Sequence, residues 1–412
     1  MRDWFRRVRF LPEGATGDAA VLLRARATRA FGDGFVSVLL PLHLTTLGLN
    51  NAKIGLVVTA TLVGSAVLTL LVGLVAYRME RRALLLRVAA LMAATGLGFA
   101  LLDDFWPIMV VAFVGTLNPS AGDVSVFLPT EQALLPQTVT PAARTALFAR
   151  YSLVGSLVAA FGALAAGVPG VLEHRTAMSS STALDLMFLL YAALGVVVLF
   201  QYRTLSPAIE PASKGATTPL GPSRRIVYRL AGLFSLDSFG GGFVVQSLLA
   251  LWLFQRFDLS VTAAGTIFFW TSLLSAFSQL AAPRLASRIG LVKTMVYTHI
   301  PANVFLMAAP FMPTLPLAIL MLLLRSTLSS MDVPARTSYV MAVVTPEERP
   351  AAASVTNVPR SLAAAASPSF AGWLLSVSGF GWPLLIGGAL KATYDLLLLH
   401  MFGKIQPPEE NG

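Results

Sequence analysis

Long apolar segments recur along almost the whole chain, and they limit the possible fold more than any other feature. A helix needs about 20 residues to cross the hydrocarbon core of a bilayer. Such segments lie near residues 27–47, 52–76, 83–102, 106–129, 144–168, 184–203, 226–255, 261–282, 292–312, 316–342, 351–376 and 382–403. The 412 residues are 56% hydrophobic and only 12% charged, against roughly 25% charged residues in a soluble protein. The runs are also far longer than the roughly 9–11 alternating residues of a β-barrel strand. The sequence therefore predicts an all-α membrane protein with twelve transmembrane helices.

Basic residues are distributed unevenly among the loops that join these segments. If both termini are cytoplasmic, most of the 30 Lys and Arg lie at cytoplasmic helix ends, and only Lys53, Arg175 and Arg256 face the other side. Positive residues favour cytoplasmic loops, so we expect a multi-pass protein of a bacterial inner membrane with both termini in the cytoplasm. The same distribution explains the net charge of +10 without a nucleic-acid partner.

Several classes of chemistry lack the residues that they need. The chain has no cysteine and its 4 histidines are scattered, so thiolate sites are excluded and we expect no metal site. It contains no G-x-x-x-x-G-K-[ST] loop for ATP, no dinucleotide fingerprint after a strand and no Ser/His/Asp grouping. We therefore expect neither enzymatic activity nor a cofactor.

The chain divides into two halves that repeat each other. The linker at residues 204–225 is rich in Pro, Ser, Thr and Gly, and it separates residues 1–203 from residues 226–412. Across it, in the same order, residues 31–36 match 239–244, 49–55 match 259–265, 73–78 match 283–288, 140–144 match 345–349 and 162–167 match 367–372. Two six-helix bundles in the same order pair about an axis along the membrane normal and enclose a cavity near the midplane. This geometry is typical of transport by alternating access.

The loop after the second predicted helix carries a family motif. Gly73, Arg78, Arg81 and Arg82 fit the pattern G-x-x-x-D-R-x-G-R-R, with Tyr77 in place of the Asp. With this motif and the repeat, the chain resembles the major facilitator superfamily over essentially its whole length. Residues 31–55 resemble its twelve-span drug:proton antiporter branch, although residues 162–167 (GALAAG) replace that branch's fifth-helix motif G-P-x-x-G-G. The resemblance implies a secondary transporter with a small-molecule substrate, and we expect a monomer in the lipid bilayer.

Ionisable residues inside a span are candidate functional groups, because each costs about 2.5–3.5 kcal/mol near the bilayer centre. We predict that Asp33 and Asp237 bind the coupling proton, while an ion pair with Arg29, four residues away, is the open alternative for Asp33. The repeat places Asp237 opposite Arg29, and this charge-reversed pair could latch the halves together on the cytoplasmic side. Lys391 and Asp395, also four residues apart, are expected to be structural.

The resemblance also implies a gate at the cytoplasmic ends of the helices, in which acids pair with the loop arginines. Asp123 and Asp332 stand at equivalent positions of the repeat, and substrate contact is the alternative role for both. The expected gating residues are Arg29, Arg78, Arg81, Arg82, Asp123, Arg288 and Asp332.

Two arginines fall near the middle of predicted spans and could meet an anionic ligand. Arg325 and Arg360 each lie about nine residues into their helices, roughly 14 Å along the axis, and a bridge to Asp332 is the alternative role for Arg325. Uncharged polar and aromatic side chains complete the expected substrate site, namely Asn118, Gln246, Trp270, Tyr339 and Asn357.

Together these features predict a secondary transporter that moves a small organic solute by alternating access, in proton-coupled efflux. Two alternatives stay open. One is an importer or uniporter of an anionic metabolite, suggested by Arg325 and Arg360. The other is a non-transporting sensor or assembly protein on the same fold, suggested by the departures from the loop and fifth-helix motifs.

Overall fold

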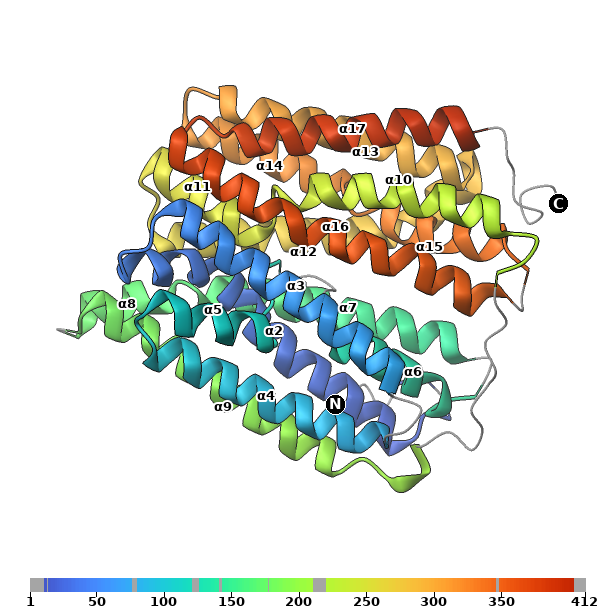
Figure 1. Cartoon of the computed structure of the whole chain (residues 1–412), viewed down its shortest axis with the longest axis horizontal. Helices are drawn as coiled ribbons and strands as arrows, with labels where there is room; N and C mark the ends of the chain where they lie inside the picture. Colours follow the sequence, from blue (N-terminus) through green and yellow to red (C-terminus); the bar gives the residue numbers. More distant parts are fainter. Residues whose placement is uncertain are drawn as a thin grey trace, which may run out of the picture.

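The protein is a bundle of helices that run roughly parallel to one long axis (Figure 1). This structure is a computed structural model, and it describes residues 11–12, 14–75, 80–120, 126–140, 143–176, 178–209, 220–345 and 348–403. Within these ranges every regular element is helical, and the helices group into twelve spans arranged as two bundles of six.

The first bundle, here called the N-bundle, is drawn in blue to green in Figure 1. Its helices are α2 (Gly17–Thr46), α3 (Asn51–Val75), α4 (Arg81–Leu101), α5 (Phe105–Val114), α6 (Phe127–Leu134), α7 (Arg144–Ala165), α8 (Val168–Arg175) and α9 (Ser180–Arg203). Short 3-10 turns follow α6 at Leu135–Gln137 and α9 at Pro207–Ile209. Within the bundle α2 packs against α7 and α9, and α4 packs against α9.

The second bundle, the C-bundle, is drawn in yellow-green to red. Its helices are α10 (Arg224–Gly242), α11 (Gln246–Phe257), α12 (Val261–Ile289), α13 (Leu291–Ala308), α14 (Leu315–Leu328), α15 (Asp332–Ala342), α16 (Arg349–Val377) and α17 (Trp382–Phe402), with a 3-10 turn at Ala309–Phe311. Here α10 packs against α16 and α17, and α13 packs against α17.

The ends of the spans fall into two groups. One group lies at the right in Figure 1 and includes the ends of α9 and α10 next to the linker; we name it the linker end. The opposite group, the far end, includes the turn between α2 and α3 and the short helix α8. Lys53, Arg175 and Arg256 all lie at the far end, close to helix termini.

Helix boundaries follow the turn chemistry of the sequence. The hydroxyls of Ser179 and Ser260 accept the backbone N–H groups of Thr182 and Ala263, each at 3.2 Å, and so cap α9 and α12. Between α12 and α13, Gly290 adopts a φ of 86°, which a residue with a side chain rarely adopts. The first helix begins at Gly17 rather than near residue 27, because residues 17–26 (GDAAVLLRAR) continue the helix and bury several apolar side chains.

Apolar surface covers the outside of the bundles, as a lipid-facing protein requires. Trp106 is 75% exposed and Leu101 is 69% exposed. Eight helices in the described part of the chain are long and apolar enough to cross a membrane. The spans formed by α2, α5 with α6, α13 and α16 fall outside that set; α2 carries several charged side chains, and α5 is only 10 residues long.

Three spans predicted as continuous helices are interrupted. The span near residues 106–129 has α5 ending at Val114 and α6 starting at Phe127, and the span near 226–255 breaks between Gly242 and Gln246. Proline lacks an N–H and glycine weakens a helix, so Pro119 and the glycines at 240–242 favour these breaks. The third break, between α14 and α15, falls at two serines and Met331.

The first two breaks meet between the bundles. The backbone N–H of Ser247, in the first turn of α11, donates to the carbonyl of Pro119 at 3.1 Å. Inside a membrane, non-helical backbone is tolerated where it is buried in protein or lines a cavity, because its polar groups need partners. At these breaks, non-helical backbone of one bundle therefore lies in hydrogen-bonding contact with that of the other bundle, in the middle of the spans.

At the far end the bundles touch through glycines of α3 and α16. A Cβ on Gly372 would lie 2.5 Å from the carbonyl oxygen of Asn51 and 2.7 Å from the Cα of Gly55, so the two backbones are in direct contact. Beside them the Asn51 amide donates to the Leu375 carbonyl at 3.0 Å. One turn further in, the Ser369 hydroxyl donates to Thr59 Oγ1 at 2.7 Å.

The equivalent contact joins α7 to α12. A Cβ on Gly265 would lie 2.6 Å from the carbonyl oxygen of Ala163, and the Thr262 hydroxyl donates to the Gly167 carbonyl at 3.4 Å. The sequence repeat matches residues 49–55 with 259–265 and residues 162–167 with 367–372. Two copies of one contact, related by the repeat, thus close the far end.

Candidate functional site

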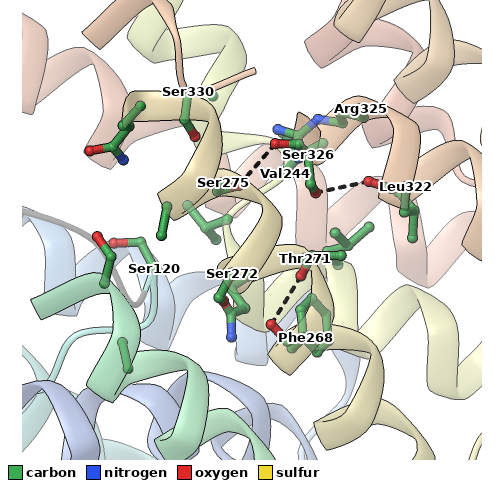
Figure 2. A pocket seen from close by; sticks show the side chains of 18 of the residues that line it. Ser120, Val244, Phe268, Thr271, Ser272, Ser275, Leu322, Arg325, Ser326 and Ser330 are labelled. Atoms are coloured by element: carbon green, nitrogen blue, oxygen red, sulfur yellow. Dashed lines mark hydrogen bonds between the residues drawn. The ribbon is translucent and has the colours of Figure 1, made fainter. Parts of the chain in front are cut away.

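A cavity of about 360 Å³ lies between the two bundles at mid-span. Its walls come from α2 and α7 of the N-bundle, from α10, α11, α12 and α14 of the C-bundle, and from the broken fourth span. Figure 2 shows Ser120 on one side of the cavity and Ser272, Ser275 and Arg325 on the other. The cavity lies where the breaks meet, so main-chain polar groups are close to it as well.

Arg325 supplies positive charge to the cavity from α14. Its Nε is buried and makes no hydrogen bond within the described part of the chain. Two hydroxyls of the cavity wall donate to main-chain carbonyls: Ser326 donates to the Leu322 carbonyl at 2.8 Å, and Thr271 donates to that of Phe268 at 3.1 Å. Towards a ligand, the hydroxyl oxygens act as acceptors and the guanidinium acts as the donor.

Arg26 supplies positive charge from the opposite bundle, and the sequence reasoning missed it. Its side chain crosses α7 at Gly155, where a Cβ would lie within 3 Å of the guanidinium, and it stacks 5.3 Å from the centre of the Tyr151 ring. Only a glycine at position 155 leaves room for it. A signal was present in the sequence, because Arg26 stands three residues before Arg29 and directly precedes the predicted first span at residues 27–47.

Arg29 forms a buried ion pair with Glu131 inside the N-bundle. Two tyrosine hydroxyls, those of Tyr151 and Tyr202, also donate to the Glu131 carboxylate, the second at 2.6 Å. The Phe127 ring lies 4.2 Å from the guanidinium carbon of Arg29. Arg29 is 1% exposed and Glu131 is fully buried. Glu131 was absent from the predicted site.

Asp33 lies one turn along α2 from this pair and is also buried. The charged groups that act on it are Arg29 and Arg26, and Tyr191 lies beside it. We name Arg26, Arg29, Asp33 and Glu131 the N-bundle cluster.

In the C-bundle, Asp237 occupies the place that Arg29 has in the N-bundle. Lys391 Nζ lies 2.5 Å from its carboxylate, Arg336 donates to it at 3.0 Å, and His299 Nε2 lies 4.0 Å away. Arg336 also pairs with Asp332 at 3.5 Å. Lys391 and Asp395 do not act as one pair, since Asp395 binds His299 and Asn303 instead. The C-bundle cluster consists of Asp237, His299, Asp332, Arg336, Lys391 and Asp395.

The main ion pairs of the two clusters are copies with reversed charge. The repeat aligns Arg29 with Asp237, and the offset that aligns residues 140–144 with 345–349 also aligns Glu131 with Arg336. The pair Arg29–Glu131 thus corresponds to Asp237–Arg336. Arg29 and Asp237 were expected to latch the halves to each other, but in this conformation each pairs within its own bundle.

The remaining predicted binding residues are spread over different environments. Gln246 lines the cavity. Asn118 is buried and accepts from the Ser120 hydroxyl at 2.8 Å, and Arg360 donates to the Ser238 hydroxyl at 2.9 Å. Trp270 of α12 is 50% exposed and is not among the residues that line the cavity. Two more residues lie apart from the cavity: Tyr339 is buried against Phe402, and Asn357 is exposed.

The expected gating residues also lie in different environments. Arg81 donates to the Ala133 carbonyl at 3.2 Å and Arg82 to that of Arg203 at 2.6 Å, so both tie helix ends of the N-bundle together. Asp332 is buried and pairs with Arg336, whereas Arg288 is exposed at the linker end of α12. Arg78 and Asp123 lie outside the described residues.

The end of the linker is held by a carboxylate next to α16. Glu348 accepts the backbone N–H groups of Gly221 and Ser223 and the Thr345 hydroxyl, the last at 3.1 Å. The Ser223 side chain first, and then these hydrogen bonds, hold the pKa of Glu348 below its ordinary value of 4.5.

Comparison with known proteins identifies the family. The model of the Major Facilitator Superfamily matches residues 25–326 and 230–412. An uncharacterized membrane protein of Saccharomyces cerevisiae, YJR124C, is 27% identical over 94% of both chains.

Solved structures share the fold at low sequence identity. The nucleoside transporter NupG superposes with a TM-score of 0.72 at 15% identity, over 94% of this chain and 99% of that one. A bacterial homologue of the human lysosomal transporter Spinster, in an inward-facing and unoccupied conformation, gives 0.71 at 15% identity, over 94% and 97%. The human organic anion transporter MFSD10 gives 0.63 at 19% identity, over 93% and 100%. The predicted twelve-helix fold is confirmed, and the chain belongs to the Major Facilitator Superfamily.

Proposed function

We propose that this protein is a secondary transporter, rather than an enzyme, that moves a small solute by alternating access to the cavity between its bundles. The observation that carries the proposal is that both bundles form the walls of one mid-span cavity. The far side of the cavity is closed by the contacts of α3 with α16 and of α7 with α12. Opening that side requires one bundle to tilt against the other, which is the movement of alternating access.

The chemistry of the walls favours an anionic solute. Arg26 and Arg325 line the cavity from opposite bundles, and the lining residues in the described part of the chain include no carboxylate. A volume of about 360 Å³ suits a small organic molecule. An anion held between the two guanidinium groups would contact both bundles at once. Its affinity would therefore depend on the relative position of the bundles.

For the coupling ion we propose the proton, bound at the buried carboxylate Asp33 in the N-bundle and within the cluster around Asp237 in the C-bundle. Efflux is the proposed direction, on the resemblance of residues 31–55 to drug:proton antiporters. Import or uniport of an anionic metabolite is the second candidate, and Arg26 and Arg325 favour it.

The proposed setting is a monomer in a bacterial inner membrane with cytoplasmic termini. The far-end positions of Lys53, Arg175 and Arg256 support this orientation, because they leave most other basic residues towards the linker end. In this orientation the closed far end faces the outside of the cell.

The test is a ligand screen on purified protein followed by flux measurements. Thermal unfolding is measured against panels of organic anions, cations and neutral solutes, because a ligand at 100 times its Kd stabilises by about 2.7 kcal/mol. Any stabilising solute is then assayed for counterflow in proteoliposomes. We expect hits among the anions, loss of stabilisation and flux in Arg325→Gln, and retention of both in Arg284→Gln, a control that removes an exposed arginine of α12.

Three results would contradict the proposal. Hits confined to cations would reject the anionic solute. Flux at the wild-type rate in Arg325→Gln would remove that residue from the site. A solute that binds without any counterflow would instead favour a sensor on the transporter fold.

A further inference from the structure

The C-bundle cluster contains more carboxylates than permanent cations. Its three carboxylates are Asp237, Asp332 and Asp395, and each is no more than 4% exposed. Its permanent cations are Arg336 and Lys391. An uncompensated charge inside a membrane protein is strongly unfavourable, so the cluster is neutral only when it holds one additional proton.

The N-bundle cluster shows what a balanced site looks like in the same fold. Two arginines, Arg26 and Arg29, face two carboxylates, Asp33 and Glu131. The charges cancel without a histidine or an extra proton. The repeat gives both bundles one central ion pair, and only the C-bundle cluster adds an imidazole and a surplus acid to it.

The hydrogen bonds and ion pairs set Asp395 apart from the other two carboxylates. Arg336 contacts Asp237 and Asp332, and Lys391 contacts Asp237. Asp395 contacts neither cation through a hydrogen bond of the described residues. Its partners are His299 Nδ1 at 2.9 Å and the Asn303 amide at 3.0 Å.

The imidazole of His299 is oriented for this task. With Nδ1–H donating to Asp395, the second ring nitrogen, Nε2, is the atom that gains a proton, and it faces Asp237 at 4.0 Å. The proton, taken from water, then lies between two carboxylates. Asp395 orients the ring and Asp237 stabilises the added charge.

Other charged and titratable groups stand on the helices that pack around the imidazole. On α17, Tyr394 places its ring 6.2 Å from the imidazole. On α16, Arg360 reaches Ser238 next to Asp237. Lys293 and His400, on α13 and α17 themselves, are exposed. On the remaining helices packed against α13, Arg284 and Arg288 of α12 are exposed near the linker end, and Arg325 of α14 lines the cavity.

We infer that the His299–Asp395 pair is a proton-binding site that holds one exchangeable proton for the C-bundle cluster. The site deepens the proposed function, on which its coupling role rests. It also adjoins the cavity: Lys391 Nζ lies 3.7 Å from the position of a Cβ on Gly241, and Gly241 lines the cavity wall. An anion at that wall competes with Asp237 for Lys391, so solute binding and proton binding affect each other.

The proton is observed directly by nitrogen NMR of histidine-labelled protein in lipid nanodiscs, without any solute. The His299 signal is the one that His299→Gln removes. We expect it to be an imidazolium signal at pH 6. In Asp395→Asn, where the acids and permanent cations balance, we expect a neutral imidazole at pH 6. A neutral His299 in the wild type at pH 6, or an imidazolium signal unchanged by Asp395→Asn, would overturn the inference.

A second arm tests the charge count by thermal unfolding. His299→Gln leaves one carboxylate uncompensated, so its unfolding midpoint should fall. The double variant His299→Gln/Asp395→Asn restores neutrality and should regain at least half of that loss. The matched control is His43→Gln with and without Asp185→Asn, because His43 is a buried histidine whose acidic neighbour is 38% exposed. There the second substitution should regain nothing. A double variant at 299 and 395 that is no more stable than the single variant would overturn the inference.

Neither the NMR experiment nor the unfolding experiment measures transport. If they succeed while no solute produces flux, the proton site stands and the proposed function fails. If flux depends on a pH gradient while both arms fail, transport stands and the proton is bound elsewhere, with Asp33 as the next group to test.

Discussion

Adding one methyl group at Gly372 should open the far end of the molecule. The three atoms nearest to the new Cβ all belong to the backbone of α3, with the Asn51 carbonyl oxygen at 2.5 Å. Backbone atoms cannot rotate away. An ordinary contact begins at 3.4 Å, so α3 and α16 must separate by about 0.9 Å in Gly372→Ala. Because these helices belong to different bundles, tilting the bundles apart relieves the contact without unpacking either one.

The expected size follows from the cost of overpacking. Extra methyl groups in a packed contact cost about 1–3 kcal/mol, and that cost falls only on the state in which the far end is closed. The ratio of open to closed molecules should therefore rise about 5- to 150-fold. Gly232→Ala is the matched control, because a Cβ there meets no atom within 4 Å. In both variants, replacing a helical glycine by alanine also raises the free energy of unfolding by about 0.5–1 kcal/mol. The comparison of the two variants therefore isolates the effect of the contact.

The populations are measured with spin labels at far-end positions on opposite bundles. The chain has no cysteine, and Lys53 on α3 and Val377 on α16 are both exposed, so cysteines there can be labelled without touching the contact. Pulsed electron paramagnetic resonance should show a larger long-distance fraction in Gly372→Ala than in the wild type or Gly232→Ala. Identical distance distributions in all three proteins would refute the reasoning.

Other substitutions test other parts of the structure. Gly265→Ala places a Cβ 2.6 Å from the Ala163 carbonyl oxygen and should raise the same long-distance fraction; an unchanged distribution would mean that the two far-end contacts do not open together. Glu131→Gln leaves the 1% exposed Arg29 without its counter-charge and should lower stability by about 3–5 kcal/mol in a chemical unfolding titration, whereas the exposed Glu80→Gln should have little effect. Glu348→Gln should unfold at a lower temperature than the wild type at pH 7, because the lowered pKa of Glu348 means that its ionised form stabilises the folded state. This contribution is lost as the pH falls through the folded-state pKa, so the difference between the two proteins should shrink below pH 4.5, and a difference that grows there would contradict the assignment.

The fold could be predicted because a membrane imposes a length and a polarity on every span. The predicted helix at 382–403 and the observed α17 agree closely, as do 83–102 and α4. The breaks could not be placed from apolar runs alone. Pro119 and the glycines at 240–242 favour two of them, but the freed backbone is satisfied by a partner from the other half of the chain, as in the hydrogen bond from Ser247 to the Pro119 carbonyl.

The candidate site was predicted less completely, because its contacts join residues far apart in the sequence. His299 and Asp395 are separated by 96 residues, and nothing local marks either as the partner of the other. Glu131 is different. The repeat that paired Arg29 with Asp237 also pairs Glu131 with Arg336, so the repeat itself carried a signal for this ion pair.

The central claim is that the bundles must move apart at the far end for solute to cross. The most direct test is a disulfide between Thr59→Cys and Ser369→Cys, whose native hydroxyl oxygens lie 2.7 Å apart across the contact of α3 with α16. The control is Asp18→Cys with Ser206→Cys, a pair whose side chains are 2.6 Å apart on the N-bundle side alone. We predict that oxidation stops flux in the first protein, that a reducing agent restores it, and that the control transports in both states. Undiminished flux through the fully cross-linked Thr59→Cys/Ser369→Cys protein would contradict the account.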